Sequence, residues 1–554
     1  MEVDHFMKIL VIGNGISGLS TAIEAASLNM QVDLAAPFAP ERTQSVMAAG
    51  GINAAVDTAG EDDSCLLHAR DTFKGGCFLE SEQNLLSFCE KAPQNLKWLD
   101  EMGVLFNRNP DHTVKVRAFG GQSRKRTVYS GASTGKQIVT ALTHKCLEYE
   151  ISGRIQTHYG LYFHSALIHE NRCFGALFFC PRTGQLVPLY ADAVVCATGG
   201  QNKLFGKTTG SELCDGYVTG KLFSQGVQLR NLEFIQYHPT TIETDHKRML
   251  ITEAARGEGG RLYYLDGKRR VYFMEDKYGS NGNLMPRDIV SREIYNCPSQ
   301  VYLDISFLDK KLIHSRLEEV YLLCRDYLRL DVTTEPIPIA PSIHFFMGGI
   351  RVDDTHRTNI EALYAVGEAA SKYHGANRLG GNSLMAAVHS GRTAAHAIQA
   401  ACSSPAVDAP LLFRSFIEQA AKELASMQQT KSQYPVVYVQ QMLSDIMNHD
   451  LGIVRTEKEL TEGLESVNFY LNILQSIHFD PTVSIYENYR IYYMAVLAKA
   501  ILSSALLRKE SRGAHFREDF PESRKEYQSS SVAEMKDQEI VIHFEQEWEG
   551  SNLL

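Results

Sequence analysis

The 554-residue sequence lacks the cysteine patterns that hold inorganic cofactors. Its 11 cysteines are scattered, and they form no C-x-x-C pair, no C-x-x-C-H motif and no cluster with histidine. These absences exclude the usual spacings for iron–sulfur clusters, structural zinc and c-type haem, so we expect no metal site. Scattered cysteines in odd number also indicate a reducing compartment.

An excess of positive charge is missing as well. Lys and Arg number 55 against 65 Asp and Glu, so the formal net charge is −10. Because nucleic-acid-binding proteins are usually basic, we expect no nucleic-acid partner, although an acidic protein can still hold a basic pocket for an anionic substrate.

Long apolar runs and a signal peptide are also absent from the sequence. No apolar run approaches the ~18 residues that cross a bilayer, so we expect no transmembrane segment. The first apolar run, residues 8–12, leads directly into a glycine turn and not into a cleavage site. We therefore expect a cytoplasmic protein, or a peripheral subunit at the inner face of the membrane.

What the sequence does contain is a nucleotide-binding pattern at its start. A short apolar strand at Lys8–Ile12 precedes a G-x-G-x-x-G turn, and a helical pattern and a second strand follow. In such a turn Gly13 permits the sharp bend, Gly15 lets the backbone approach a pyrophosphate, and Gly18 lets the helix pack closely. The helix N-terminus offers N–H groups to the phosphates.

One element of the dinucleotide fingerprint is missing. An acidic residue should end the second strand and bind ribose hydroxyls, but the strand ends in Ala35 and Ala36. Asp33 lies nearby, but strand alternation can direct it away, so we do not assign it.

The length of the whole chain, at about 150 residues per domain, suggests three or four domains. Strand-like runs at 193–197 and 362–366 each end in glycine, whereas residues 232–350 between them are polar and poorly periodic, as in an insertion. Residues 403–410 resemble a linker. Residues 411–510 show helical periodicity, and the last ~35 residues are polar, which indicates a surface extension.

Five clusters carry histidine or arginine, three of them together with glycine, which suits an oxyanion ligand. Guanidinium groups bind carboxylates in bidentate fashion, and histidine adds a directional donor. For Arg292, Glu258 and His246 taken singly we favour a structural role, but five clusters together favour a site for a small dianion. The clusters are residues 237–240, 250–260, 285–292, 343–349 and 374–383.

Together these motifs make the chain resemble the flavoprotein subunits of succinate dehydrogenase and fumarate reductase, with the related L-aspartate oxidases. The matches run in family order from Lys8 to Pro521 and include AAGGINAA, QYHPT, LITEAARGEGG, HFFMGG and HGANRLGGNSL. The resemblance implies an α/β fold: a Rossmann-like FAD-binding domain in two segments (1–231 and 351–402), an inserted α+β capping domain (232–350) and a C-terminal helical domain with a polar tail (403–554).

The resemblance also implies roles for single residues. Arg287 would donate the proton in fumarate reduction, with Glu253 and Arg256 relaying it. The substrate would be held by Phe119, His238, Thr252, His344 and Arg378. FAD would be held by Gly13, Gly15, Ser17, Gly18, Ser45, Ala49, Gly50, Gly51, Thr198, Gly199, Asp215, Glu368, Asn382, Ser383 and Leu384.

Gln44 marks a departure from the membrane-bound relatives, in which a histidine at this place carries FAD covalently. Glutamine cannot form that linkage, so we expect non-covalent FAD, which implies a lower flavin potential and favours fumarate reduction over succinate oxidation. Without a haem or iron–sulfur motif, electrons must come from outside, for example from an iron–sulfur subunit.

Two alternatives are weighed against this function. L-aspartate oxidases resemble REGGHS where this chain has Arg117–Gln122, and Phe119 replaces their glutamate, so a substrate ammonium would lack its acidic partner. A non-enzymatic FAD-binding assembly protein is disfavoured because the full set of reactive side chains implied by the resemblance is present, namely His238, Glu253, Arg256, Arg287, His344 and Arg378.

Overall fold

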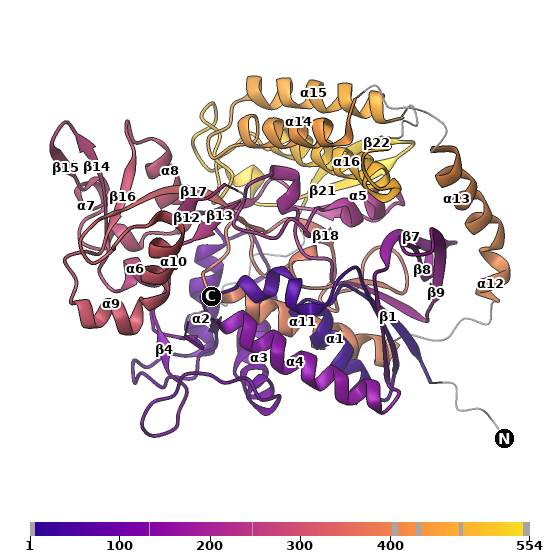
Figure 1. Ribbon diagram of the computed structural model, residues 1–554, viewed down its shortest axis with the longest axis horizontal. Coiled ribbons are helices and arrows are strands. Elements are labelled where there is room, and N and C mark those ends of the chain that lie inside the picture. Colours follow the sequence, from indigo (N-terminus) through magenta and orange to yellow (C-terminus); the bar gives the residue numbers. More distant parts are fainter. Residues whose placement is uncertain are drawn as a thin grey trace.

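Figure 1 shows a computed structural model of the chain, which describes residues 6–131, 133–245, 247–401, 408–427, 434–475 and 480–546. Its first sheet is parallel, with the strand order β19-β10-β1-β2-β6. Strands β10 and β19 join this sheet only after long intervening segments of the chain, as the apolar runs at 193–197 and 362–366 predict. The strands are β1 (Lys8–Ile12), β2 (Gln31–Ala36), β6 (Ile155–Tyr159), β10 (Ala193–Cys196) and β19 (Leu363–Ala365).

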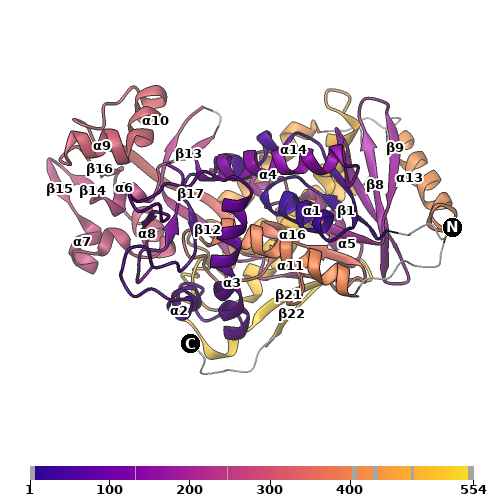
Figure 2. The same ribbon diagram turned by 90° about the horizontal axis from the view of Figure 1, so that it is seen from below.

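Both faces of this sheet are covered, because alternate residues of each strand point to opposite sides. Ile9 and Val11 belong to a core shared with four helices, which lie beside one another in Figure 2. Leu10 and Ile12 belong to a second core on the other face, with a three-stranded sheet and the C-terminal helices. The four helices are α1 (Ile16–Ser27), α3 (Glu82–Glu101), α4 (Thr134–Ile151) and α11 (Asn382–Ala401).

The elements of the second face come from two distant parts of the chain. The three-stranded sheet is β7 (Tyr162–His169), β8 (Arg172–Cys180) and β9 (Gln185–Tyr190). The helices are α5 (Tyr217–Ser224), α12 (Ala409–Leu412), α13 (Arg414–Met427), α14 (Val436–His449), α15 (Glu457–Gln475) and α16 (Ile485–Leu507). All of them except α5 follow the helical periodicity that predicts helices in 411–510. Of the expected linker, residues 403–407 lie outside the described residues, and the next ones lead into α12.

The polar segment after residue 231 builds a sheet and a core of its own, at the left of Figure 1. The strand order is β13-β12-β17-β16-β14-β15. These strands are β12 (Ile235–Glu243), β13 (Arg248–Leu250), β14 (Arg261–Asp266), β15 (Arg269–Val271), β16 (Val301–Asp304) and β17 (Ile337–Phe346). The helices around them are α6 (Ala254–Gly257), α7 (Phe273–Tyr278), α8 (Arg287–Tyr295), α9 (Lys310–Arg316) and α10 (Glu318–Leu328).

The expectation of a surface extension at the C-terminus is wrong. Strands β21 (Ser530–Lys536) and β22 (Glu539–Glu545) form an antiparallel hairpin, and β21 pairs with β11 (Leu229–Arg230). Val532 and Ala533 are buried there. Half of this hairpin is polar because it is the edge of a five-stranded sheet, and that masks its alternation in the sequence. The strand order of this sheet is β20-β18-β11-β21-β22, in which β18 is Gly349–Arg351 and β20 is Ala370–Ser371.

One helix of the described residues, α16, is long and apolar enough to cross a membrane, whereas no such segment was expected from the sequence. Its mean hydropathy over 18 residues is 1.4, and 61% of that window is buried inside the molecule. The helix contacts α15, α5 and α14, so its apolar surface is covered by the protein's own elements.

Buried histidines should make the fold sensitive to acid. Burial lowers the pKa of His68 and of His356 to about 4. Between that value and the ordinary pKa of 6.5 the unfolded chain binds more protons than the folded one, so stability falls as the pH falls through this window. At pH 5 each histidine should cost about 2 kcal/mol. The thermal unfolding midpoint of the FAD-saturated protein, measured at pH 7 and pH 5, should drop.

Matched variants identify the groups responsible for that drop. The variant His356→Gln should show a smaller difference between the two pH values, because it removes one of the titrating groups. The exposed control His112→Gln should show the same difference as the wild type. A midpoint that does not fall at pH 5 would contradict this prediction.

Candidate active site

A cavity of about 550 Å³ lies at the carboxyl ends of β1, β10 and β19, where open α/β sheets bind ligands. The glycine turn after β1 forms one wall, with Gly13 at φ +104°. A Cβ on Gly13 would lie 2.3 Å from the carbonyl oxygen of Ala197, and one on Gly18 would lie 1.9 Å from the oxygen of Gly13. Only glycine therefore lets the turn, the start of α1 and the end of β10 approach so closely.

A second wall is the glycine-rich segment after β2. Gly51 has φ +134°, and a Cβ there would lie 2.6 Å from Thr127 Cγ2. A Cβ on Gly50 would lie 3.1 Å from the ring of Phe119. The segment is tied to the start of α1 by Ser45 Oγ, which accepts from Ile16 N at 3.1 Å.

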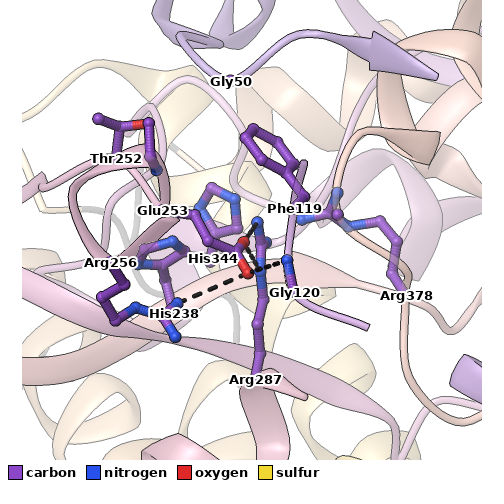
Figure 3. Close-up of polar contacts among 12 residues, drawn as sticks. Gly50, Phe119, Gly120, His238, Thr252, Glu253, Arg256, Arg287, His344 and Arg378 are labelled. Carbon is purple, nitrogen blue, oxygen red and sulfur yellow. Dashed lines mark hydrogen bonds and ion pairs between the residues drawn. The ribbon is translucent and has the colours of Figure 1, made fainter. Parts of the chain in front are cut away.

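At one end of the cavity a carboxylate holds two arginines, as Figure 3 shows. Arg287, the first residue of α8, donates from Nε and Nη2 to Glu253 Oε2 at 3.0 and 2.7 Å. Gly120 N donates to Glu253 Oε1 at 2.9 Å, and Arg256 Nη2 lies 3.6 Å from the same oxygen. Burial raises the pKa of Glu253, but the charges of Arg287 and Arg256 outweigh it, so the pKa lies below its usual value.

Gln236 connects this group to Arg378, and the sequence analysis did not assign it. Its Oε1 accepts from Arg287 Nη1 at 3.1 Å and from Arg378 Nη2 at 2.9 Å. Its Nε2 donates to Asn377 Oδ1 and to the carbonyl oxygen of Arg378. A signal existed in the sequence, because Gln236 lies two residues before His238 on strand β12 and so shares its face.

The two histidines of the cluster are neutral near pH 7. The rings of His238 and His344 lie 5.2 Å apart, and burial followed by the charge of Arg287 holds both pKa values well below 6.5. Burial and Arg287 likewise lower the pKa of Arg378, whose Nε has no hydrogen-bond partner. With the histidines neutral, the three guanidinium groups and the carboxylate of Glu253 leave two positive charges, which suits a dianion.

Most of the residues singled out in the sequence line this one cavity. They are Gly13, Gly15, Ser45, Ala49, Gly50, Gly51, Phe119, Thr198, Gly199, Asp215, His238, Thr252, Glu253, Arg287, His344, Glu368, Arg378, Ser383 and Leu384.

Four of the proposed site residues do not line the cavity. Arg256 lies behind Glu253 and donates to Asn283 O at 2.6 Å. Asn382 is bonded to side chains of the FAD-binding fold, among them Thr72 Oγ1 at 3.0 Å. Ser17 and Gly18 belong to the buried side of α1. These residues support the lining from behind.

Residues that the sequence analysis left unassigned make structural contacts. Arg292 lies 4.4 Å above the ring of Phe516, and Glu258 pairs with Arg316 at 2.9 Å. Asp33 pairs with Lys8 and with the ring of His158. His246 lies outside the described residues.

Two models of known protein families match the chain. Residues 8–384 match a family model described as an FAD-binding domain, and residues 440–547 match one described as the fumarate reductase flavoprotein C-terminal region. The turn from Gly13 to Gly18, called the glycine cradle below, and the N-terminus of α1 fit the pyrophosphate of that cofactor. The protein is an FAD-dependent oxidoreductase. It belongs to the family of succinate dehydrogenase and fumarate reductase flavoprotein subunits.

The relatives confirm the resemblance drawn from the sequence. The chain is 37% identical to the succinate dehydrogenase flavoprotein subunit of Bacillus subtilis over 540 residues, which covers 93% of this chain and 91% of the relative. It is 32% identical to the fumarate reductase flavoprotein subunit of Haemophilus influenzae, with coverages of 93% and 90%. A solved chain of E. coli quinol fumarate reductase superposes with a TM-score of 0.88 at 28% identity, covering 99% of this chain and 98% of that one.

Proposed function

We propose that this protein reduces fumarate to succinate with non-covalently bound FAD. The observation that carries the proposal is the end of the cavity lined by Arg287, Arg378 and Glu253, with Arg256 behind Glu253, because the excess of two positive charges in this group matches a dicarboxylate. The family matches support the class of reaction, and Gln44 supports the direction and the mode of FAD binding.

In this mechanism the substrate carboxylates are bound by Arg378, His238, His344 and Thr252, which orient the double bond. FAD, when bound, supplies a hydride through its N5 atom. Neutral histidines donate hydrogen bonds to a carboxylate without adding charge that would have to be neutralised elsewhere. Holding both carboxylates stabilises the negative charge that develops on the alkene carbon that does not receive the hydride.

Arg287 is the proton donor in this proposal. Its Nη1 and Arg378 Nη2 share the oxygen of Gln236, so two like charges face each other in a buried site. Repulsion of this kind favours the loss of a proton from one of them. Glu253 then returns a proton to Arg287 across the 2.7 Å hydrogen bond, and Arg256 supplies Glu253 from behind.

Electrons must reach the cofactor from another molecule. We propose an iron–sulfur subunit as the donor and a peripheral position on the cytoplasmic side of the membrane, because the relatives above are named as flavoprotein subunits.

Steady-state fumarate reduction by the purified chain, with a reduced viologen dye as donor, tests the function. Turnover of fumarate supports the proposal. Formation of an imine from aspartate without fumarate turnover would contradict it and indicate an L-aspartate oxidase. Phe119 argues against that outcome, because it occupies the place of the acidic partner of a substrate ammonium and is buried against Gly50.

Acid precipitation of the protein should release all its flavin into the supernatant as intact FAD. Gln44 lines the cavity at the family's attachment position, and its side-chain oxygen accepts a hydrogen bond from Ser211 N. The proposal of non-covalent FAD rests on the chemistry of this side chain, because an amide cannot form the histidyl linkage. The absorbance of the supernatant and its behaviour in chromatography against FAD and FMN measure the release. Yellow colour that stays with the denatured pellet would contradict non-covalent binding.

The variant Phe119→Glu should raise the KM for fumarate about tenfold or more, because it adds an anion where the substrate is an anion. Phe119 is 5% exposed and lies beside the arginine cluster, so the new charge cannot turn to solvent. The surface variant Phe307→Glu, at a site that is 56% exposed, is the matched control and should leave KM unchanged. An unchanged KM in Phe119→Glu would show that this ring does not face the substrate.

A further inference from the structure

The cavity extends beyond the cofactor-binding fold to a helix of the C-terminal part of the chain. Ser484, Tyr486, Glu487 and Arg490, at the start of α16, line it together with residues that follow β2 and β6. The sequence predicts a C-terminal helical domain for this part of the chain and assigns none of its residues to the cofactor site. Because α16 lines the cavity, it is expected to contact one part of the bound FAD.

The topology of the parallel sheet indicates which part of FAD lies beside α16. FAD is a linear molecule with the flavin ring at one end and the adenine ring at the other. For hydride transfer the flavin ring must lie beside Arg287 and Gly50, and the pyrophosphate must lie at Gly15 and the N-terminus of α1. The adenosine half must then continue past β2, and the sheet order β1-β2-β6 leads it towards Tyr162, which begins β7 just after β6. This is the end of the cavity that α16 closes.

Aromatic side chains from three parts of the chain meet at this end. The rings of Tyr162 and Tyr486 lie 4.4 Å apart, and the ring of Phe38, just after β2, lies 6.0 Å from Tyr162. The Tyr486 side chain is buried at 5% exposure, yet its hydroxyl makes no hydrogen bond of normal geometry. Flat apolar faces with an unpartnered hydroxyl suit an adenine ring, which stacks on aromatic rings and offers polar edges.

A carboxylate held by α16 lies at the same end. Arg490 Nη1 donates to Asp215 Oδ2 at 2.9 Å, and Arg490 Nη2 donates to Glu487 at 3.0 Å. Asp215 is 6% exposed and lines the cavity, so Arg490 keeps a buried acid oriented where ribose hydroxyls need an acceptor. The strand-end acid that usually does this is absent, and Asp33 is already paired with Lys8 at 2.7 Å.

We infer that α16 completes the cofactor site: Tyr486 and Arg490 bind the adenosine half of FAD, with Asp215, positioned by Arg490, accepting from the ribose. The inference rests on the orientation of FAD proposed above. It assigns to the C-terminal helix a share in distinguishing FAD from FMN, which lacks the adenosine.

Titration of the flavin-free full-length chain with FAD and with FMN, followed by flavin fluorescence, tests this inference. The variants are Arg490→Gln and Tyr486→Phe, of which the second removes only the hydroxyl and keeps the packing. We expect the Kd for FAD to rise about tenfold in Arg490→Gln and about threefold to tenfold in Tyr486→Phe, with the Kd for FMN unchanged. AMP should compete with FAD in the wild type and less strongly in both variants.

Two residues of the same helix that do not line the cavity provide matched controls. Tyr492→Phe and Lys499→Gln should leave both dissociation constants unchanged. An equal rise for FAD and FMN would mean that the variants disturb the fold, and no rise for either would mean that α16 does not contact the cofactor; both results overturn the inference. Fumarate turnover by the wild-type protein is measured separately, so a failure of the proposed function is recognised independently.

Discussion

Replacing Arg287 by alanine should lower kcat for fumarate reduction about 100-fold or more, because a general acid acts only in the transition state. Arg287 reaches the cavity from the first turn of α8 and is held by Glu253 through two hydrogen bonds. The FAD content should not change, since no wall of the glycine cradle is touched. Viologen-linked turnover and the flavin absorbance of the same sample measure both quantities.

Lysine at the same position separates a proton donor from a binding residue. If Arg287 only clamped a carboxylate, Arg287→Lys would retain the charge and lose about 1–3 kcal/mol, mainly through KM. A loss confined to KM with kcat near the wild-type value would exclude the proton-donor role. Arg292→Ala is the matched control, because Arg292 lies on the same helix but stacks on Phe516 away from the cavity.

The variant Glu253→Gln should show a kcat loss of similar size, about 100-fold, with little change in shape. Its carboxylate links Arg256 to Arg287, and an amide cannot pass a proton between them. Rates at several pH values and the FAD content of the variant provide the measurement. Glu258→Gln is the matched control, because Glu258 pairs with Arg316 outside the cavity lining.

The double variant of Arg287→Ala and Glu253→Gln tests whether the two residues act as one unit. We expect it to be little slower than either single variant, because residues of one relay are not additive. Losses that multiply would show that Glu253 and Arg287 act independently, and the relay would then be wrong.

Several features could be predicted from the sequence because short stretches of chain determine them. The turn from Gly13 to Gly18 is local: a strand, three glycines and a helix in continuous sequence define its shape. The five histidine and arginine clusters were recognisable because each carries its motif within about ten residues. That they line one cavity was an expectation of the resemblance, and the structure brings His238, Arg287 and Arg378 together there.

Other features depend on tertiary structure, since their partners are remote in sequence. Gln236 gains its place only because Arg287 and Arg378, 51 and 142 residues away, donate to its one oxygen. The hairpin of β21 and β22 looked like a polar tail because its strands are completed by Leu229 and Arg230, about 300 residues earlier.

The sequence by itself determined the glycine turn, the family and the histidine and arginine motifs that meet at one end of the cavity, because each is encoded in a contiguous motif. Only the tertiary structure decided what closes the opposite end of the cavity. Nothing local in the sequence of α16 shows that its first turn lines a cavity, since the helix is largely apolar and mostly buried, as an ordinary core helix is. The pairing of Arg490 with Asp215, 275 residues apart, is made by the packing of the C-terminal helices on the parallel sheet.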